Sequence, residues 1–258
     1  MKEQGAATAE IGRDIAETAA AASEMTERAP PRCRRGGADR AARRRRARKV
    51  DVVVIRPSDH RDVLRKEGNR VDQKWHVIGS QTLMRDRWID VRADDCITSV
   101  GVKISPYYVL TYPDWVHVVA ITSAGSLVLV RQYRHAVSEF LLELPGGAVD
   151  EEDPNLEQAA RRELEEETGF TAQRWELVTS LYPNPATHTN RVHFFLAQDC
   201  ECTHPQKLDA GEGGLAVELV EIPLVLDRLR SGMLGQATHV AGVLLGLAAA
   251  GRLSITAT

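Results

Sequence analysis

The feature that most constrains this chain is a predicted helix whose packed face carries carboxylates. The helix covers Pro154–Thr168, with Asp153 as its N-cap and Gly169 as its stop. One arc of the helical wheel is small and apolar, and its members are Leu156, Ala159, Ala160 and Leu164. The sequence therefore predicts that this side of the helix packs against a protein core.

Three glutamates share that arc. On a wheel of 100° per residue, Glu163 and Glu167 lie about 20° from Leu156, and Glu166 lies about 80° away, whereas Glu165 falls on the solvent side. Carboxylates that face an interior repel one another and are costly to desolvate without a counter-charge. Mg²⁺ supplies such a charge, and it prefers carboxylate, water and phosphate oxygens. The pattern predicts a hard-cation site for a phosphate-bearing ligand.

Length and charge limit the rest of the chain. The 258 residues are 43% hydrophobic and 27% charged, enough for one large domain or two small ones. Residues 28–49 hold eleven Arg or Lys and one Asp, a charge of +10, so the remainder of this −3 chain carries −13. We expect residues 1–70 to be a disordered Ala/Arg-rich tail on an acidic body, because its arginines repel one another.

Neither a membrane nor an oxidising compartment is expected. The longest apolar stretch, Val240 to Ala250, is far shorter than the roughly 20 residues of a membrane-spanning helix. No signal peptide is seen at the N-terminus, and four cysteines form no disulfide framework. We therefore expect a cytoplasmic protein.

From Trp75 onward, short β-prone runs alternate with few helices. Ser123–Gly125 separates two of these runs, Trp115–Thr122 and Ser126–Arg131, as the loop of a hairpin. The other predicted strands are His76–Ser80, Arg87–Ala93, Val102–Ile104, Tyr107–Thr111, Trp175–Leu181, Arg191–Ala197 and Leu215–Ile222, and the other predicted helices are Leu224–Arg230 and Gln236–Ala250. The pattern favours an α/β (α+β) fold in which helices pack on a mixed sheet.

The acidic helix and the loop before it resemble the Nudix box. The stretch Arg162–Phe170 (RELEEETGF) matches the second half of that motif at every specified position, and Gly147 matches its first glycine. The spacing from Gly147 to Arg162 is 162 − 147 = 15, one more than the motif has, so its first Glu falls on Asp153 or on Glu152. The resemblance implies a Nudix fold, a mixed β-sheet sandwiched between helices (α/β/α).

Over residues 75–250, the chain resembles the ADP-ribose pyrophosphatase branch of this family. The segments Leu127–His135 (LVLVRQYRH) and Leu142–Gly147 (LELPGG) carry this resemblance, and so does the proline at 185. The branch implies a small N-terminal β-subdomain over residues 71–113 that exchanges with a partner in a homodimer, and a hydrolase domain over 114–258. The expected reaction is metal-dependent hydrolysis of the diphosphate bond of a nucleoside diphosphate linked to another group, above all ADP-ribose.

The resemblance also implies roles for individual residues. Glu163, Glu166 and Glu167, with the backbone carbonyl of Gly146, would hold Mg²⁺, for which Mn²⁺ could substitute. Metal ions bridging two phosphates neutralise their charge and activate a water molecule. Glu212, in the acidic loop Asp209–Gly214, is the candidate general base, although a plain exposed loop acid is the alternative.

Two arginines and a proline complete the predicted substrate site. Arg131 and Arg134 end a predicted strand, and a guanidinium suits phosphate oxygens, although an ordinary salt bridge is the alternative. Pro185 is the proline that this branch often carries beyond the box. Trp88, Tyr108 and Trp115 could stack on a base, or they could belong to the core.

Three other functions compete with this interpretation. The substrate could be another nucleoside diphosphate sugar or a dinucleotide, or the chain could sense ADP-ribose without cleaving it. A nucleic-acid-binding or decapping role for residues 32–49 is the third, although we expect no nucleic-acid partner. Deletion of residues 1–70 distinguishes this role from hydrolysis, because nucleic-acid binding or decapping should be lost whereas sugar-nucleotide hydrolysis should survive.

Overall fold

The computed structural model of the protein describes residues 74–254. The tail expected over residues 1–70, with its basic segment, lies outside the described residues. Within residues 74–254, no helix is both long enough and apolar enough to cross a membrane.

The first described strands form a three-stranded antiparallel sheet. They are β1 (His76–Arg85), β2 (Asp90–Ile97) and β3 (Lys103–Thr111), in the order β1-β2-β3. The separate runs expected at Val102–Ile104 and Tyr107–Thr111 are therefore one strand. Every residue of β1 is exposed, including Val77, Ile78 and Met84. This sheet leaves an apolar surface uncovered in a single chain.

A second sheet of eight strands holds most of the core. Its central order is β11-β5-β4-β10-β8, while β6 pairs with β5, β7 with β4 and β9 with β10; β10 runs parallel to β4. The strands are β4 (Trp115–Thr122), β5 (Ser126–Arg134), β6 (Glu139–Glu143), β7 (Gly146–Ala148), β8 (Phe170–Thr171), β9 (Arg174–Leu181), β10 (Val192–Cys202) and β11 (Ala216–Glu221). The strand predicted to end at Arg131 continues to Arg134, because β6 pairs with it that far.

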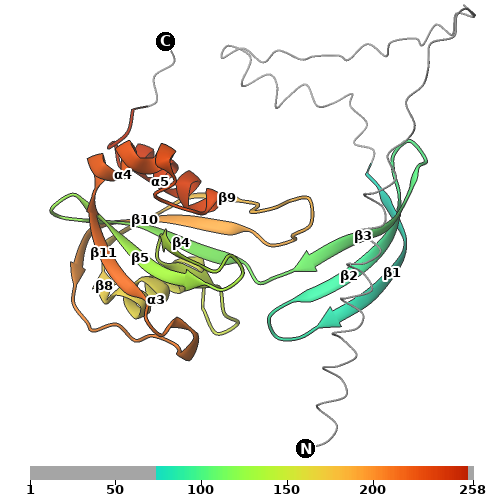
Figure 1. Ribbon diagram of the computed structural model, residues 1–258, viewed down its shortest axis with the longest axis horizontal. Helices are drawn as coiled ribbons and strands as arrows, with labels where there is room; N and C mark the ends of the chain where they lie inside the picture. The colour runs from blue at the N-terminus through green and yellow to red at the C-terminus, as the bar shows by residue number, and fades with distance from the viewer. Residues whose placement is uncertain (1–73, 255–258) are drawn as a thin grey trace, which may run out of the picture. The chain divides into compact units, whose positions relative to one another are not determined.

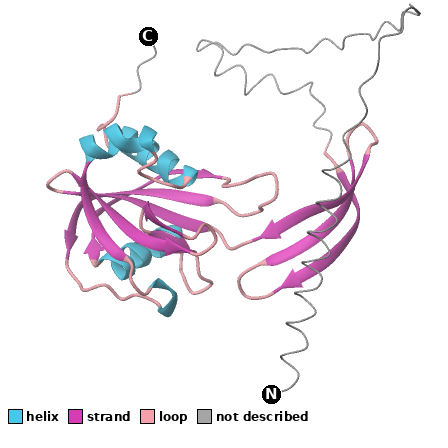
Figure 2. Ribbon diagram, in the orientation of Figure 1, coloured by secondary structure: helices cyan, strands magenta, loops and turns pink. Residues whose placement is uncertain are grey.

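Helices cover both faces of this sheet (Figure 1, Figure 2). They are α3 (Leu156–Thr168), α4 (Ile222–Arg228) and α5 (Ala237–Ala249). One 3₁₀ turn, η3 (Ala210–Glu212), lies between β10 and β11, and another, η4 (Leu229–Ser231), follows α4 directly. Helix α3 packs on one face, and α4 and α5 pack on the other. The expected mixed sheet sandwiched between helices is confirmed.

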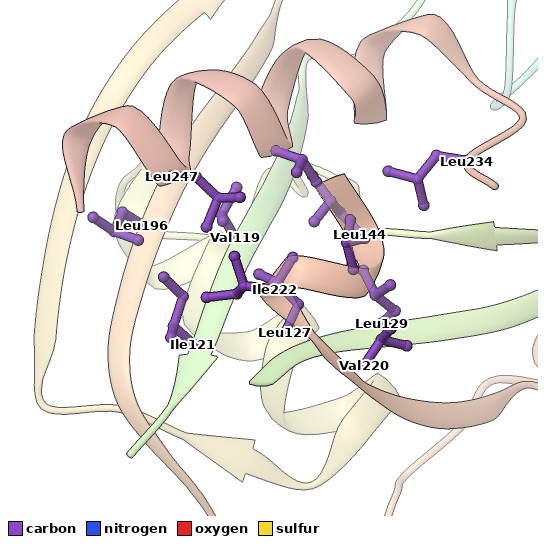
Figure 3. Close-up of a cluster of buried hydrophobic side chains, with 12 residues drawn as sticks. Val119, Ile121, Leu127, Leu129, Leu144, Leu196, Val220, Ile222, Leu234 and Leu247 are labelled. Atoms are coloured by element: carbon purple, nitrogen blue, oxygen red, sulfur yellow. The ribbon is translucent and has the colours of Figure 1, made fainter. Parts of the chain in front are cut away.

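Strand alternation divides the buried side chains between two layers. Successive side chains of a strand point to opposite faces, so Val116, Val118 and Ala120 pack toward α3, whereas Val119 and Ile121 pack toward α4 and α5. Figure 3 shows the second layer, in which Val119, Leu144 and Leu247 lie between α5 and the strands. Odd-numbered positions of β4 therefore face α5.

The N-cap of α3 corrects one expectation. The cap is Asn155, not Asp153, because the Asn155 side chain accepts the backbone N–H of Gln158 at 3.0 Å. The last turn ends at Gly169, as predicted, in a left-handed conformation with φ of 73°. Asp153 lies before the helix and has a different partner.

The end of β3 is tied to the loop that precedes β10. Leu110 donates its N–H to the carbonyl of Thr187 at 2.8 Å and accepts the N–H of Thr189 at 3.1 Å. The loop that contains Pro185 is therefore held against the three-stranded sheet.

Candidate active site

Two adjacent glycines bring the main chain of β7 between β4 and helix α3. Gly146 has φ of 151°, and a Cβ there would overlap the carbonyl oxygen of Val116. A Cβ on Gly147 would lie 2.6 Å from Oε1 of Glu163. Only glycine fits at 146, and at 147 a side chain would displace the carboxylate of Glu163, so the Pro-Gly-Gly turn lets this backbone approach α3 closely.

The predicted burial of two glutamates is confirmed. Glu163 and Glu167 are only 8% and 4% exposed, and Glu167 accepts the backbone N–H of Gly146 at 2.8 Å. Burial raises the pKa of Glu163 to about 7 and that of Glu167 to about 8, and the charge of nearby Glu212 adds to both shifts. Two carboxylates whose charge is disfavoured in this way call for a cation.

Arg162 supplies part of that counter-charge. Its guanidinium lies 2.8 Å from Asp153, 2.9 Å from Glu163 and 3.2 Å from Glu166. The same group donates to the carbonyl of Ala148 at 3.1 Å. Asp153 therefore holds the guanidinium of Arg162 in place, despite the extra residue between Gly147 and Arg162.

The third glutamate has a different environment. Glu166 is partly exposed and lines a groove of about 570 Å³ beside α3, together with Arg162 and Lys207. Glu165 points to solvent, as predicted. Glu166 is thus less buried than Glu163 and Glu167, although it shares Nη1 of Arg162 with Glu163.

A cavity of about 800 Å³ opens beside Glu167. Its lining includes Gly146, Arg134 and Glu212, so the structure brings three predicted site residues together with Glu167. The predicted aromatic residues Trp88 and Trp115 line it too, whereas Tyr108 does not. The cavity therefore combines acidic, basic and flat apolar groups.

The two candidate arginines lie on opposite sides of β5. Arg134 lines the cavity and is held by the buried carboxylate of Glu143, at 2.6 Å from Nη2 and 3.0 Å from Nε. Arg131 instead lies 4.5 Å from the ring centroid of Phe140. Gln132, two residues before Arg134, faces the cavity. Only one of the two guanidinium groups lies beside the acidic helix.

Glu212 and Pro185 also differ in their placement. Glu212 ends η3 and lines the cavity, and it accepts the backbone N–H of Asp209 at 2.9 Å. Pro185 is exposed and is not part of the cavity lining. Within one described chain, the predicted general base is therefore close to the buried glutamates, and the predicted substrate-binding proline is not.

Two histidines in the cavity wall were missed by the sequence interpretation. His117 of β4 and His239 of α5 stack with ring centroids 4.3 Å apart. Burial lowers the pKa of His117 to about 4 and that of His239 well below its usual value. His239 shares a face of α5 with the buried residues Gly242, Val243, Gly246 and Leu247, but nearly every residue of this helix is apolar, so no sequence pattern singles out that face.

The carboxylates of α3 have the chemistry of a hard divalent cation site, since they offer oxygen ligands that lack a full counter-charge. Within residues 74–254, however, no three acidic, histidine or cysteine side chains already surround one point. Arg162 holds Glu163 and Glu166 on its own side. Cation binding therefore requires these two carboxylates to change partners.

Two family models match this chain. The NUDIX domain matches residues 111–233, and the nucleoside diphosphate sugar hydrolase N-terminal domain matches residues 75–110. The second range covers β1, β2 and most of β3. The matches thus fall on the two sheets in turn.

Curated relatives and a solved structure agree with these models. An ADP-ribose pyrophosphatase of Bacillus subtilis (strain 168) is 32% identical over 57% of this chain and 78% of its own length. An ADP-ribose pyrophosphatase of Mycobacterium tuberculosis is 28% identical over 67% and 83%. A GDP-mannose pyrophosphatase of Cronobacter sakazakii is 32% identical over 45% and 63%. A crystal structure described as an ADP compounds hydrolase superposes with a TM-score of 0.61 at 26% identity, over 70% of this chain and 98% of that one.

Proposed function

This chain belongs to the Nudix family, and on that premise we propose that it hydrolyses ADP-ribose to AMP and ribose 5-phosphate. Water supplies the oxygen that forms the new P–O bond, and the bridging P–O bond of the diphosphate breaks. The two protons of the water leave with the products or with the solvent. The relatives named for ADP-ribose and GDP-mannose hydrolysis support a pyrophosphohydrolase of nucleoside diphosphate sugars.

The observation that carries the proposal is the burial of Glu163 and Glu167 beside Gly146 and Gly147. Together with Glu166 and the carbonyl of Gly146, these side chains would hold Mg²⁺, or Mn²⁺ in its place. A bound divalent cation neutralises the charge of the diphosphate and favours in-line attack by water. The N–H of Gly146 holds Glu167 in position, whereas Glu163 would have to exchange its contact with Arg162 for the cation.

Glu212 and Arg134 have separate tasks in this proposal. Glu212 lies close enough to raise the pKa of both buried glutamates, and we assign it the proton of the attacking water. Arg134, fixed by Glu143, would place its guanidinium on a phosphate oxygen. Arg131 and Pro185 remain substrate-binding candidates only if a second subunit completes the site.

The test is a substrate panel with a matched pair of variants. The wild type, Glu167→Gln and Glu165→Gln are each incubated with Mg²⁺ and ADP-ribose, ADP-glucose, GDP-mannose, NADH or dGTP, and the products are separated chromatographically. Glu165 is the control because it lies on the same helix but faces solvent. We expect AMP from ADP-ribose, a loss of at least about 100-fold in Glu167→Gln, and no change in Glu165→Gln.

Each other outcome selects a rival. Cleavage of a different nucleotide in the same glutamate-dependent way would keep the reaction and replace the substrate. Binding of ADP-ribose without turnover would support a sensor. Equal activity of the two variants would contradict the role of the buried carboxylates.

We further propose a homodimer in which residues 71–113 form the dimerisation subdomain and 114–258 the catalytic domain. Its support is the exposed apolar surface of the three-stranded sheet, where Trp75, Val77, Ile78 and Met84 are each about half exposed or more. Sedimentation equilibrium of the wild type and of Ile78→Lys tests this, and a wild-type monomer contradicts it. We also propose a cytoplasmic location, which the free thiols of Cys96, Cys200 and Cys202 support.

A further inference from the structure

The stacked histidines lie in the wall of the proposed active site. His117 and His239 are 6% and 2% exposed, and they come from the central strand β4 and from the first turns of α5. They line the same cavity as Glu167 and Arg134. The position of His117 in β4 explains its closeness to the acidic helix, because His117 pairs in register with Gly146.

The hydrogen bonds of this pair are incomplete. Leu144 donates its backbone N–H to Nδ1 of His239 at 2.9 Å, so the neutral ring carries its hydrogen on Nε2. Among residues 74–254, Nδ1 of His117 has no hydrogen-bond partner and is buried, and the same holds for Oε1 of Gln132, which lines the same cavity. Buried polar atoms in folded proteins are nearly always hydrogen-bonded, so these atoms indicate a place for a ligand.

The unpaired atoms define the chemistry of that ligand. Oε1 of Gln132 can only accept a hydrogen bond, whereas Nε2–H of His239 donates one. An anionic group without a hydrogen cannot donate to Oε1 of Gln132. An apolar group satisfies neither atom. A hydroxyl both donates and accepts, so a set of hydroxyls fits.

We infer that His117, His239 and Gln132 form a subsite for the hydroxyls of a sugar joined to the diphosphate. This inference rests on the proposed function. In a nucleoside diphosphate sugar each phosphate is esterified to a sugar, so the neutral group next to the diphosphate is a sugar on either side. The nucleobase lies one sugar farther away, and the flat rings of Trp88 and Trp115 suit it better. These three residues determine specificity and take no part in bond breaking.

The test uses His239→Asn, because the Asn carbonyl oxygen can still accept the N–H of Leu144 while the Nε2–H donor is lost. His117→Phe is the second variant, since it keeps the ring and removes both nitrogens. His193→Asn is the matched control, because His193 is equally buried but its partners are Ser180 and Asp114, and it does not line the cavity. Thermal unfolding of each variant is measured alongside.

Three substrates locate the sugar: ADP-ribose, its 2′,3′-dideoxyadenosine analogue, and the methyl ester of ADP, which has no second sugar. Loss of one neutral hydrogen bond predicts a KM for ADP-ribose that is about 3- to 10-fold higher in His239→Asn, with kcat changed less than about 2-fold. This increase in KM should vanish with the analogue that lacks the contacted hydroxyls, and the analogue in question identifies which of the two sugars occupies the subsite. His193→Asn should show no such dependence on substrate.

An equal increase in the KM of His239→Asn for all three substrates, or no increase for any of them, would overturn the inference. Its failure can be told apart from failure of the proposed function. If the wild type does not cleave ADP-ribose, calorimetric titration of ADP-ribose into the wild type and into His239→Asn still measures whether His239 contributes to binding. A wild type that neither cleaves nor binds ADP-ribose would contradict both the proposed function and this inference.

Discussion

Helices α3 and α5 each have thirteen residues and pack on opposite faces of one sheet, yet their buried polar groups differ. Helix α3 buries two carboxylates that lack a full counter-charge, whereas α5 buries one neutral histidine among glycines and aliphatic side chains. The comparison teaches that a charge on a packed face indicates an ion site, while a neutral polar group there indicates a hydrogen-bonding site. The following changes test each half of this comparison.

The largest effect is expected where β7 meets α3. In Gly147→Ala, the new Cβ would lie 2.6 Å from Oε1 of Glu163, at the movable end of that side chain. The protein should fold, but a carboxylate displaced by about 1 Å can cost about 100-fold in kcat. Steady-state assays measure this. Gly125→Ala is the control: its φ of 85° makes alanine strained there, so this variant should lose some stability but keep its activity. Wild-type activity in Gly147→Ala would contradict the account.

The corresponding change in α5, Gly246→Ala, should lower the stability of the protein instead of its activity. A Cβ on Gly246 would lie 2.7 Å from Cγ2 of Val119. Overpacking of about 1–3 kcal/mol should exceed the roughly 1 kcal/mol that alanine gains over glycine in a helix. Urea denaturation is expected to show a net loss of about 1 kcal/mol, and a more stable variant would show that α5 does not pack this closely.

In metal-free protein, the pH dependence of stability should have opposite signs for Glu167 of α3 and for His117 of β4, which stacks on His239 of α5. The pKa of Glu167 rises from 4.5 to about 8 on folding, so its contribution is fully present below pH 4.5 and is lost as pH rises through about 8. The pKa of His117 falls from 6.5 to about 4, so its contribution is present above pH 6.5 and is lost as pH falls through about 4.

Denaturation series from pH 4 to pH 8, in the presence of a chelator, check both signs. Relative to Glu167→Gln, the wild type should lose stability as the pH rises, with a slope of at most about 1.4 kcal/mol per pH unit. Relative to His117→Phe, it should lose stability as the pH falls from 6.5. Parallel curves for either pair would mean that the buried group does not titrate as described.

The smallest effect concerns the N-caps. Asn155→Ala should cost about 1 kcal/mol, because its side chain caps α3. Gln236→Ala should cost almost nothing, since the Gln236 side chain makes no cap hydrogen bond on α5. Thermal melts of both variants decide this, and equal losses would contradict the assignment of the caps.

Both helices could be predicted from the sequence, but the functional side chains only in α3 and not in α5. In α3 most residues are polar, so the few apolar side chains define a packed arc and the glutamates on it stand out. In α5 nearly every residue is apolar, so no arc is distinguishable and His239 carries no special weight. His117 is likewise hidden in an apolar strand. Its contact with His239 depends on the packing of α5 on β4, which no local pattern specifies.

Long-range pairing also explains the remaining differences. The extension of β5 to Arg134 depends on β6, and that pairing separates Arg131 from Arg134. The cap at Asn155 could not be distinguished from Asp153 by residue type, because both residues are good caps. Asp153 instead has Arg162 as its partner, which only the folded chain reveals.

The central claim is that the buried glutamates of α3 bind a divalent cation. Calorimetric titration of Mn²⁺ into the wild type, Glu167→Gln and Glu165→Gln tests it directly. The account predicts that the wild type and Glu165→Gln bind the ion with similar affinity, whereas Glu167→Gln binds it at least about 10-fold more weakly. Unchanged affinity in Glu167→Gln, or an equal loss in Glu165→Gln, would contradict it.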